Sequence, residues 1–334
     1  RFNHPAHTEA YIVGGFIHTL DYVGLVDLDT ISKSRIALIA RLITGFAGVL
    51  SGLVLYAIVN KVFSRSLAGL STLLFLTNPM VIQLSKLYRP EIFLTTFLLI
   101  SFLFLLCYVE GEDDVYMGGA AFFVGLAMMS KYPGLIGLVP IVIVLMSKHK
   151  SFLKTLESLG TTVVGLVIGV YVGSPTMLLN IEKAVESISF EQRSHHLGAD
   201  GLSFFQNLIW YINRYSNVLG TFASMVLIAG VIFALYFVVR KRSEIKAPDG
   251  VKLALVTVVS LLIAVSSLSL HWVRWFFPAV PFIYIVVVFG YQQTISKLRT
   301  NWLKVLLTCL ILVVPLTRTI QYTYALGSGD TRIT

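Results

Sequence analysis

Long runs of apolar residues dominate this chain, and their lengths are those that a lipid bilayer requires of a helix. A helix needs about 20 consecutive apolar residues, within a range of about 17–25, to cross the hydrocarbon core. On this criterion we predict eight membrane-spanning segments: Ala37–Val59, Leu67–Leu84, Ile92–Val109, Leu159–Thr176, Val218–Val239, Leu253–Leu270, Phe276–Gly290 and Leu303–Thr319.

Two shorter apolar runs, Met117–Met129 and Gly134–Met146, are separated by the polar break Ser130–Pro133. They predict either one kinked helix or two short helices that meet at a buried polar point. Two helices are favoured, because Lys131 in the middle of a membrane without a water-filled cavity would cost several kcal/mol. The sequence therefore predicts an all-α, polytopic integral membrane protein with about ten transmembrane helices and short interfacial helices in its outer loops.

The composition excludes a water-soluble protein. Of the 334 residues, 56% are hydrophobic and 13% are charged, whereas about 25% of the residues in soluble proteins are charged. The net charge of +9 comes from basic residues in short loops between the apolar runs. Such loops are retained in the cytoplasm, and no stripe of Lys and Arg with interleaved aromatic residues predicts a nucleic-acid partner.

The distribution of Lys and Arg predicts which loops face the cytoplasm. The basic loops assigned to the inner side are Lys61–Arg65, Lys148–Lys154, Arg240–Lys252 and Gln292–Lys304. The alternate loops, among them Asn180–Tyr215 and His271–Arg274, then face outward. The acidic loop Glu110–Asp114 falls on the inner side against this pattern. It is the one inner feature that could hold a divalent metal, but no metal site and no cofactor are indicated by the sequence.

The chain is interpreted as one transmembrane domain, residues 1–334. Its parts are an outer loop with interfacial helices (1–35), spans (36–176), an outer amphipathic loop (177–215), further spans (217–320) and the start of an outer C-terminal segment (321–334). Apolar residues at helical spacing in the long outer loop predict a short amphipathic helix, Ile181–Ile188, on the outer leaflet or packed on the loops. We expect Trp210, Tyr211 and Tyr215 to form an interfacial aromatic belt.

Charged and polar residues gather on the predicted outer face, several of them directly against helix ends. The candidate site residues are His4, Glu9, Arg89, Glu91, Lys131, His271 and Arg274. Arg89–Glu91 has the form of a helix start, with Pro in the first turn and Glu favoured by the helix dipole, but this leaves Arg89 unexplained. Cations with a few acids at an outer membrane face suit a substrate that carries phosphate and arrives from the bilayer.

Several short segments carry a family resemblance. They are Phe2–Pro5, Arg41–Ile43, Phe63–Gly69, Asn78-Pro79, Arg89–Glu91, Gly125–Gly134 and His271–Pro281. In order and spacing these segments resemble the polyprenyl-phosphate-sugar-dependent glycosyltransferases of the GT-C superfamily. The similarity is greatest to the protein mannosyltransferase and lipid A aminoarabinose transferase group, in which Arg-Pro-Asp is usual where this chain has Arg-Pro-Glu.

The chain departs from the family pattern at both ends. The catalytic acid of the family, an Asp-Glu pair after the first span, should precede His4, and the chain does not contain it. At the other end, Ser328–Arg332 resembles the entrance to the family's soluble outer domain. The chain thus resembles an interior portion of such an enzyme, and activity is expected of the full enzyme rather than of this portion alone.

The resemblance implies that a sugar moves, with inversion at the anomeric carbon, from a polyprenyl-phosphate donor to a protein, lipid or glycan acceptor. The reaction would take place on the extracytoplasmic face of the plasma membrane. The donor phosphate would be bound by His4, Arg89, Lys131 and Arg274. Glu91 would be the catalytic carboxylate, either orienting a cation or receiving a proton, and Glu9 and His271 would contact the acceptor or substrate.

Two other functional classes stay open at this point. A secondary transporter would also have many spans and buried charge, but it predicts matched helix breaks in two halves of the chain. The break at Ser130–Pro133 has no evident counterpart. A catalytically inactive membrane homologue predicts no clustering of charge on one face.

Overall fold

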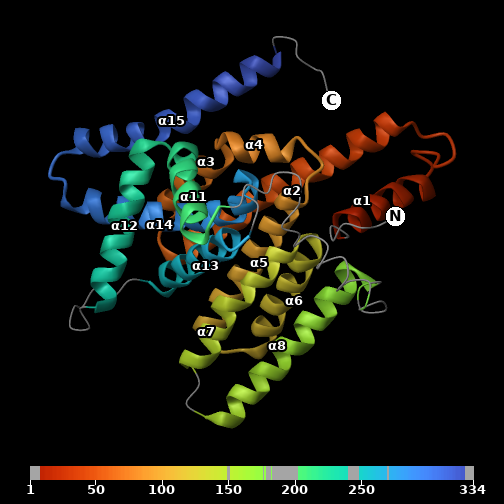
Figure 1. Ribbon diagram of the computed structural model, residues 1–334, viewed down its shortest axis with the longest axis horizontal. Coiled ribbons are helices and arrows are strands. Elements are labelled where there is room, and N and C mark those ends of the chain that lie inside the picture. The colour runs from red at the N-terminus through yellow and green to blue at the C-terminus, as the bar shows by residue number, and fades with distance from the viewer. Residues whose placement is uncertain are drawn as a thin grey trace.

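The computed structural model describes residues 8–148, 151–175, 177, 182, 202–239, 248–268 and 271–327. Within these ranges every regular element is a helix, and Figure 1 shows how the helices are arranged. The elements are α1 (Thr8–Tyr22), α2 (Lys33–Val62), α3 (Arg65–Leu76), α4 (Pro79–Ser85), α5 (Pro90–Gly111), α6 (Asp114–Ser130), η1 (Tyr132–Gly137), α7 (Leu138–Lys148), α8 (Phe152–Gly173), α11 (Phe204–Leu219), α12 (Thr221–Val239), α13 (Asp249–Ser266), η2 (Val273–Ala279), α14 (Val280–Lys297) and α15 (Asn301–Gly327).

Six helical segments of the described chain are long and apolar enough to cross a membrane, and the bent pair α3–α4 makes a seventh if it counts as one span. Three further apolar helices are shorter: Asp114–Ser130, Tyr132–Lys148 and Thr221–Tyr236. These elements confirm the predicted all-α, polytopic membrane protein. The total of about ten spans stays a prediction.

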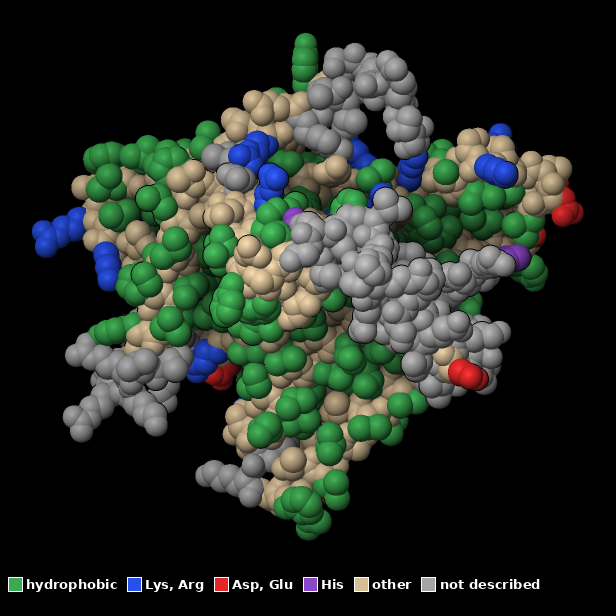
Figure 2. Space-filling model, in the orientation of Figure 1, with side chains coloured by type: hydrophobic (Ala, Val, Ile, Leu, Met, Phe, Trp, Pro, Cys, Tyr) green, Lys and Arg blue, Asp and Glu red, His purple; other side chains and the backbone are tan. Residues whose placement is uncertain are grey.

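Large apolar side chains cover much of the outer surface (Figure 2). Phe46, Met146 and Phe152 are 69%, 78% and 79% exposed. Exposing such a side chain to water costs about 1.5–3 kcal/mol relative to burying it. A hydrocarbon environment around the helices removes this cost.

Helix α5 lies at the centre of the fold and packs against both α2 and α6. The helices α6, α7 and α8 lie together beside it, and α12, α13 and α14 form a second group (Figure 1). Glycines of α8 allow it to approach α6 very closely, because a Cβ added to Gly165 or Gly169 would overlap the backbone of α6. Small residues four apart permit such contacts between helices in a membrane.

Two of the predicted spans are broken rather than continuous. Leu67–Leu84 divides into α3 and α4, which are bent by 62°. At the break, Asn78 accepts a hydrogen bond from the backbone N–H of Met80 at 2.9 Å, so it caps α4, and its side-chain amide donates to the Tyr284 hydroxyl at 2.9 Å. The run Val218–Val239 is interrupted at Gly220, whose φ of 86° favours glycine.

The two short helices predicted around Lys131 are confirmed. Helix α6 ends at Ser130, and the chain then turns through η1 into α7. At the far end of α7, the Lys148 ammonium donates to the Val109 carbonyl at 2.7 Å. Since Val109 lies at the end of α5 next to the start of α6, α7 runs back antiparallel to α6 and leaves Lys131 at the turn.

Three of the loops predicted to be cytoplasmic, Lys61–Arg65, Glu110–Asp114 and Lys148–Lys154, meet at one end of the molecule. Lys61 Nζ lies 2.5 Å from Glu110 Oε2, and Lys154 Nζ lies 3.4 Å from Glu112 Oε2. The acidic loop Glu110–Asp114, whose charge is opposite to that of the other inner loops, therefore forms ion pairs with lysines of the neighbouring loops. Lys131 lies at the other end of α5 and α6. The inner and outer faces predicted from the distribution of Lys and Arg are therefore opposite ends of the structure.

We expect these two ends to lie on opposite sides of the membrane. In a chain whose Cys107 and Cys309 are replaced by serine, Ser267→Cys should react with an impermeant maleimide in intact cells. Ser151→Cys, at the lysine-rich end, should react only after permeabilisation. Both serines are exposed. Labelling of Ser151→Cys from outside would reverse the orientation.

Candidate active site

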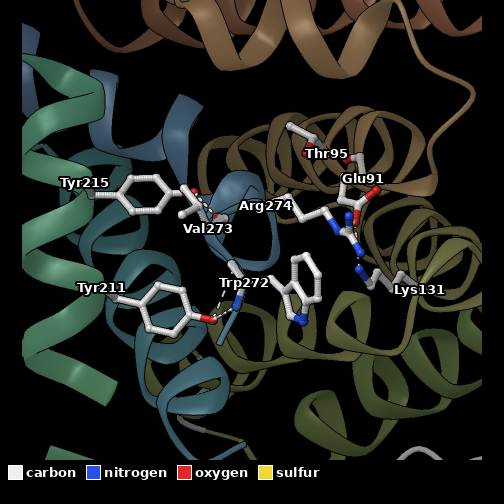
Figure 3. Close-up of polar contacts among 8 residues, drawn as sticks. All are labelled: Glu91, Thr95, Lys131, Tyr211, Tyr215, Trp272, Val273 and Arg274. Atoms are coloured by element: carbon white, nitrogen blue, oxygen red, sulfur yellow. Dashed lines mark hydrogen bonds and ion pairs between the residues drawn. The ribbon is translucent and has the colours of Figure 1, made fainter. Parts of the chain in front are cut away.

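Three helix ends bring one carboxylate and two cations together. Glu91 lies in the first turn of α5, Lys131 lies between α6 and η1, and Arg274 lies in η2 (Figure 3). The backbone before α5 is extended at Arg89, and Pro90 occupies the first helical position, where its missing N–H is not needed. This sequence starts the helix sharply and fixes Glu91 at the end of the bundle.

Glu91 is held between the two cations. Its Oε1 lies 2.8 Å from Lys131 Nζ and 3.4 Å from Arg274 Nε. The Glu91 side chain is 2% exposed, that of Lys131 15% and that of Arg274 31%. Ion pairs this buried are screened little by solvent, so the two cations and the carboxylate interact strongly.

The pairing leaves unsatisfied polar atoms at the centre of the site. Among the described residues, Glu91 Oε2 and Arg274 Nε are buried and have no hydrogen-bond partner, since Nε is not aligned for a hydrogen bond to Oε1. Burying such atoms without a partner costs about 1–3 kcal/mol each. The three side chains together carry one excess positive charge. An anion with hydrogen-bond acceptors would balance this charge and accept from Arg274 Nε, whereas Glu91 Oε2 can only accept and needs a donor.

Tyrosines of α11 fix the segment that carries Arg274. Tyr215 donates a hydrogen bond to the Val273 carbonyl at 2.7 Å, and the Tyr211 hydroxyl contacts both the N–H and the carbonyl of Trp272, at 3.2 and 3.3 Å (Figure 3). Both tyrosines are buried, with exposures of 0% and 3%. The prediction that they form an interfacial belt is wrong, because their hydroxyls position η2.

Tryptophans flank the two cations. The Arg274 guanidinium carbon lies 4.6 Å from the centre of the Trp272 ring, and Lys131 Nζ lies 5.4 Å from that of Trp275. Cation–π contacts of this kind contribute about 0.5–2 kcal/mol, with the larger values at sites shielded from water. They hold the cations in place without neutralising them, which leaves their charge for a ligand.

The remaining predicted site residues are Arg89, His271, His4 and Glu9. Arg89 is half-buried, and its charge acts on Lys131. His271 stacks on Trp210 of α11 with 4.2 Å between ring centres. His4 and the predicted amphipathic helix Ile181–Ile188 lie outside the described residues.

Glu9 lies in α1, which is not among the membrane-spanning candidates. Its side chain is almost completely buried, at 3% exposure of the residue. Burial raises the pKa of Glu9 to about 7, against a smaller opposing effect of its own backbone N–H. The charges of Glu91 and Lys131 also act on it, in opposite directions. Glu9 is therefore electrostatically coupled to the cluster.

Sequence reasoning missed the residues that hold the cluster in place. Tyr211 and Tyr215 are four residues apart and so lie on one face of α11, which is the signal that could have identified a shared buried role. Nothing in the sequence alone pairs them with the backbone of η2. As for metals, no three His, Cys, Asp or Glu side chains of the described residues are grouped so that they could hold an ion.

Comparisons with known proteins are consistent with the predicted resemblance. Residues 33–175 match the model of the dolichyl-phosphate-mannose-protein mannosyltransferase family. No curated protein matches the chain in sequence. The matched region contains Arg89, Glu91 and Lys131, while Arg274 lies beyond it.

Solved structures share the fold. ArnT from Cupriavidus metallidurans in the apo state is 15% identical over 97% of this chain and 71% of that chain, with a TM-score of 0.61. The same protein bound to undecaprenyl phosphate is 14% identical over 98% and 68%, with a TM-score of 0.59. The oligosaccharyltransferase AglB from Archaeoglobus fulgidus, in complex with an inhibitory peptide and a dolichol-phosphate, is 14% identical over 97% and 51%, with a TM-score of 0.54. These likenesses confirm the fold that the resemblance implied.

The ion cluster predicts a non-additive response to mutation. Glu91→Gln should lower the free energy of unfolding by about 3–5 kcal/mol, because it leaves two partly buried cations without their anion. Adding Lys131→Met should recover part of this loss, so the double variant should be more stable than the sum of the single effects predicts. Denaturant unfolding in detergent micelles measures all three variants.

Lys154→Met is the matched control. Its partner Glu112 is 45% exposed, so the loss should be about 1 kcal/mol or less. Strict additivity of Glu91→Gln and Lys131→Met would contradict the coupling described here.

Proposed function

We propose that this chain, which has the fold of the GT-C membrane glycosyltransferases, is the membrane part of an enzyme that uses a lipid-linked sugar. The sugar would move from a polyprenyl-phosphate donor to a protein, lipid or glycan acceptor at the extracytoplasmic face of the plasma membrane. The observation that carries this proposal is the cluster of Lys131, Glu91 and Arg274, with its excess positive charge and the buried Arg274 Nε, which lacks a hydrogen-bond partner among the described residues.

The chemistry of such a donor requires this kind of charge. When the bond between the anomeric carbon and the phosphate oxygen breaks, the electron pair stays on the phosphate, and negative charge grows on the leaving oxygen. Cations placed beforehand in a site that excludes water stabilise this charge effectively, because they need not reorganise during the reaction. Lys131 and Arg274 would serve this purpose, and Arg89 would add charge nearby.

Glu91 takes the part of a positioning residue in this proposal. Its Oε1 already receives both cations, so a proton taken up there would break the two contacts. A carboxylate that orients the cations keeps them from spreading apart in an apolar environment. Of the two roles predicted for Glu91, the geometry thus favours orientation of cations over proton transfer.

The position of the cluster favours a donor that arrives through the membrane. It lies at the ends of apolar helices, and a bilayer spanned by these helices would hold its lipid headgroups at such ends. At the opposite end, the described connections are short: two residues join α2 to α3 and two join α5 to α6. Such connections cannot fold into the domain that a soluble nucleotide sugar would require. The relatives' structures with undecaprenyl phosphate and dolichol-phosphate support a lipid phosphate.

A donor assay tests the proposal. Membranes containing the full-length protein, stripped of endogenous lipid carrier, would receive either a polyprenyl-phosphate sugar or the matching nucleotide sugar. We expect transfer from the lipid-linked sugar. Lys131→Ala should reduce the rate roughly 10²–10³-fold, as the loss of one contact to a developing oxyanion does.

Lys154→Ala, which removes a lysine from the opposite end, should leave the rate unchanged. Protein amount and monodispersity must match between the variants. Transfer from the nucleotide sugar alone would refute the lipid donor, and near-normal turnover of Lys131→Ala would show that this lysine is structural.

A further inference from the structure

A second buried carboxyl, that of Glu9, is coupled electrostatically to Glu91 and Lys131. Glu9 is 3% exposed, and its Oε2 has no hydrogen-bond partner among the residues that the structure describes. A carboxyl buried in this way is costly whether charged or neutral, because each form lacks contacts that water would supply. Such an atom next to a cation cluster indicates a partner that arrives with the substrate.

The neighbouring residue holds Glu9 firmly in place. The Thr8 hydroxyl lies 3.2 Å from the Gly173 carbonyl of α8 and 3.4 Å from the Leu126 carbonyl of α6. A Cβ on Gly173 would lie 2.8 Å from the Thr8 hydroxyl oxygen, so this close contact depends on glycine. The start of α1 is thereby fixed against the ends of α6 and α8. Lys131 directly follows the end of α6.

Charged groups on several elements act on Glu9. Burial has the largest effect and raises its pKa to about 7. Its own backbone N–H lowers the pKa, Glu91 of α5 raises it and Lys131 lowers it. The charge of Glu9 in turn acts on Tyr88, in the connection between α4 and α5. Near neutral pH both forms of Glu9 are therefore populated, and a nearby charge decides between them.

We propose that Glu9, in its neutral form, donates a hydrogen bond to the phosphate of the lipid-linked donor bound by Lys131 and Arg274. This inference rests on the proposed function. An arriving phosphate adds negative charge to the site, which disfavours a second carboxylate and favours the protonated acid. The acid O–H then supplies the donor that a phosphate oxygen accepts, and Oε2 gains the partner that it lacks.

Proton uptake on donor binding follows from this arrangement. Above about pH 7 free Glu9 is mostly a carboxylate, so binding must take a proton from solution. The affinity should then fall by up to about tenfold for each pH unit above about 7. Below this pH Glu9 already carries its proton, and the affinity should not depend on pH. The donor is a phosphodiester with one charge across this range, so the dependence belongs to the protein.

Calorimetry with a short-chain polyprenyl-phosphate sugar tests the proposal on the full-length protein in detergent. In buffers of different ionisation enthalpy, the wild type should take up a proton on binding at about pH 8. Glu9→Gln replaces the O–H by an amide N–H that needs no proton. It should bind with an affinity that does not change between about pH 7 and 9, and without proton uptake.

His18→Asn, at an exposed histidine of α1, is the control, because a histidine can also take up a proton when an anion binds. It should keep the proton uptake. Unchanged uptake in Glu9→Gln would overturn the assignment of Glu9, as would loss of uptake in His18→Asn. If Glu9→Gln does not fold, the absence of uptake in the wild type still refutes the proposal. Failure of the wild type to bind the lipid-linked sugar at all would refute the proposed function instead.

Discussion

The Glu91 carboxylate between Lys131 and Arg274 is the interaction on which the functional end of this structure depends. Each partner comes from a different element, α5, the α6–η1 turn and η2, so the ion pairs tie three helix ends together. Isolated charges at this position would be costly, since apolar helices surround them. Together the three charges stabilise one another, which lowers this cost, but they do not sum to zero and their hydrogen bonds are incomplete. This incompleteness is the feature that distinguishes a binding site from a structural ion pair.

The two ends of the molecule differ in how they treat charge. At the lysine-rich end, Lys61 and Lys154 each meet a carboxylate of the acidic loop, and the pairs are partly open to solvent. Such pairs contribute little to stability, and they require no ligand. At the opposite end the ions are buried, flanked by tryptophans and short of partners. A transporter would need access to its site from both ends, whereas among the described residues the buried cations that could bind an anion lie at one end.

Much of this architecture could be predicted from the sequence, because a helix that crosses a bilayer must have an apolar run within a narrow range of lengths. The apolar runs predicted the helices, and the cost of a buried Lys131 predicted the turn at that residue. The breaks at Asn78 and Gly220 were not predicted, because the apolar runs continue on both sides of them and hydropathy alone does not indicate a bend. Glu91, Lys131 and Arg274 could be singled out as charges at helix ends, but their convergence depends on contacts across nearly two hundred residues. The burial of Tyr211 and Tyr215 was mistaken for an interfacial position, since amphipathic aromatic residues occur in both settings.

The most direct test of the central claim is a structure of the full-length protein, determined by cryo-electron microscopy with a polyprenyl phosphate bound. Phosphate oxygens should lie within hydrogen-bonding distance, about 2.7–3.2 Å, of both Lys131 Nζ and the Arg274 guanidinium, while Glu91 keeps its contact to Lys131. Phosphate density at the lysines of the opposite end, beside Lys148 or Lys154, with the Glu91 cluster unoccupied, would contradict the account.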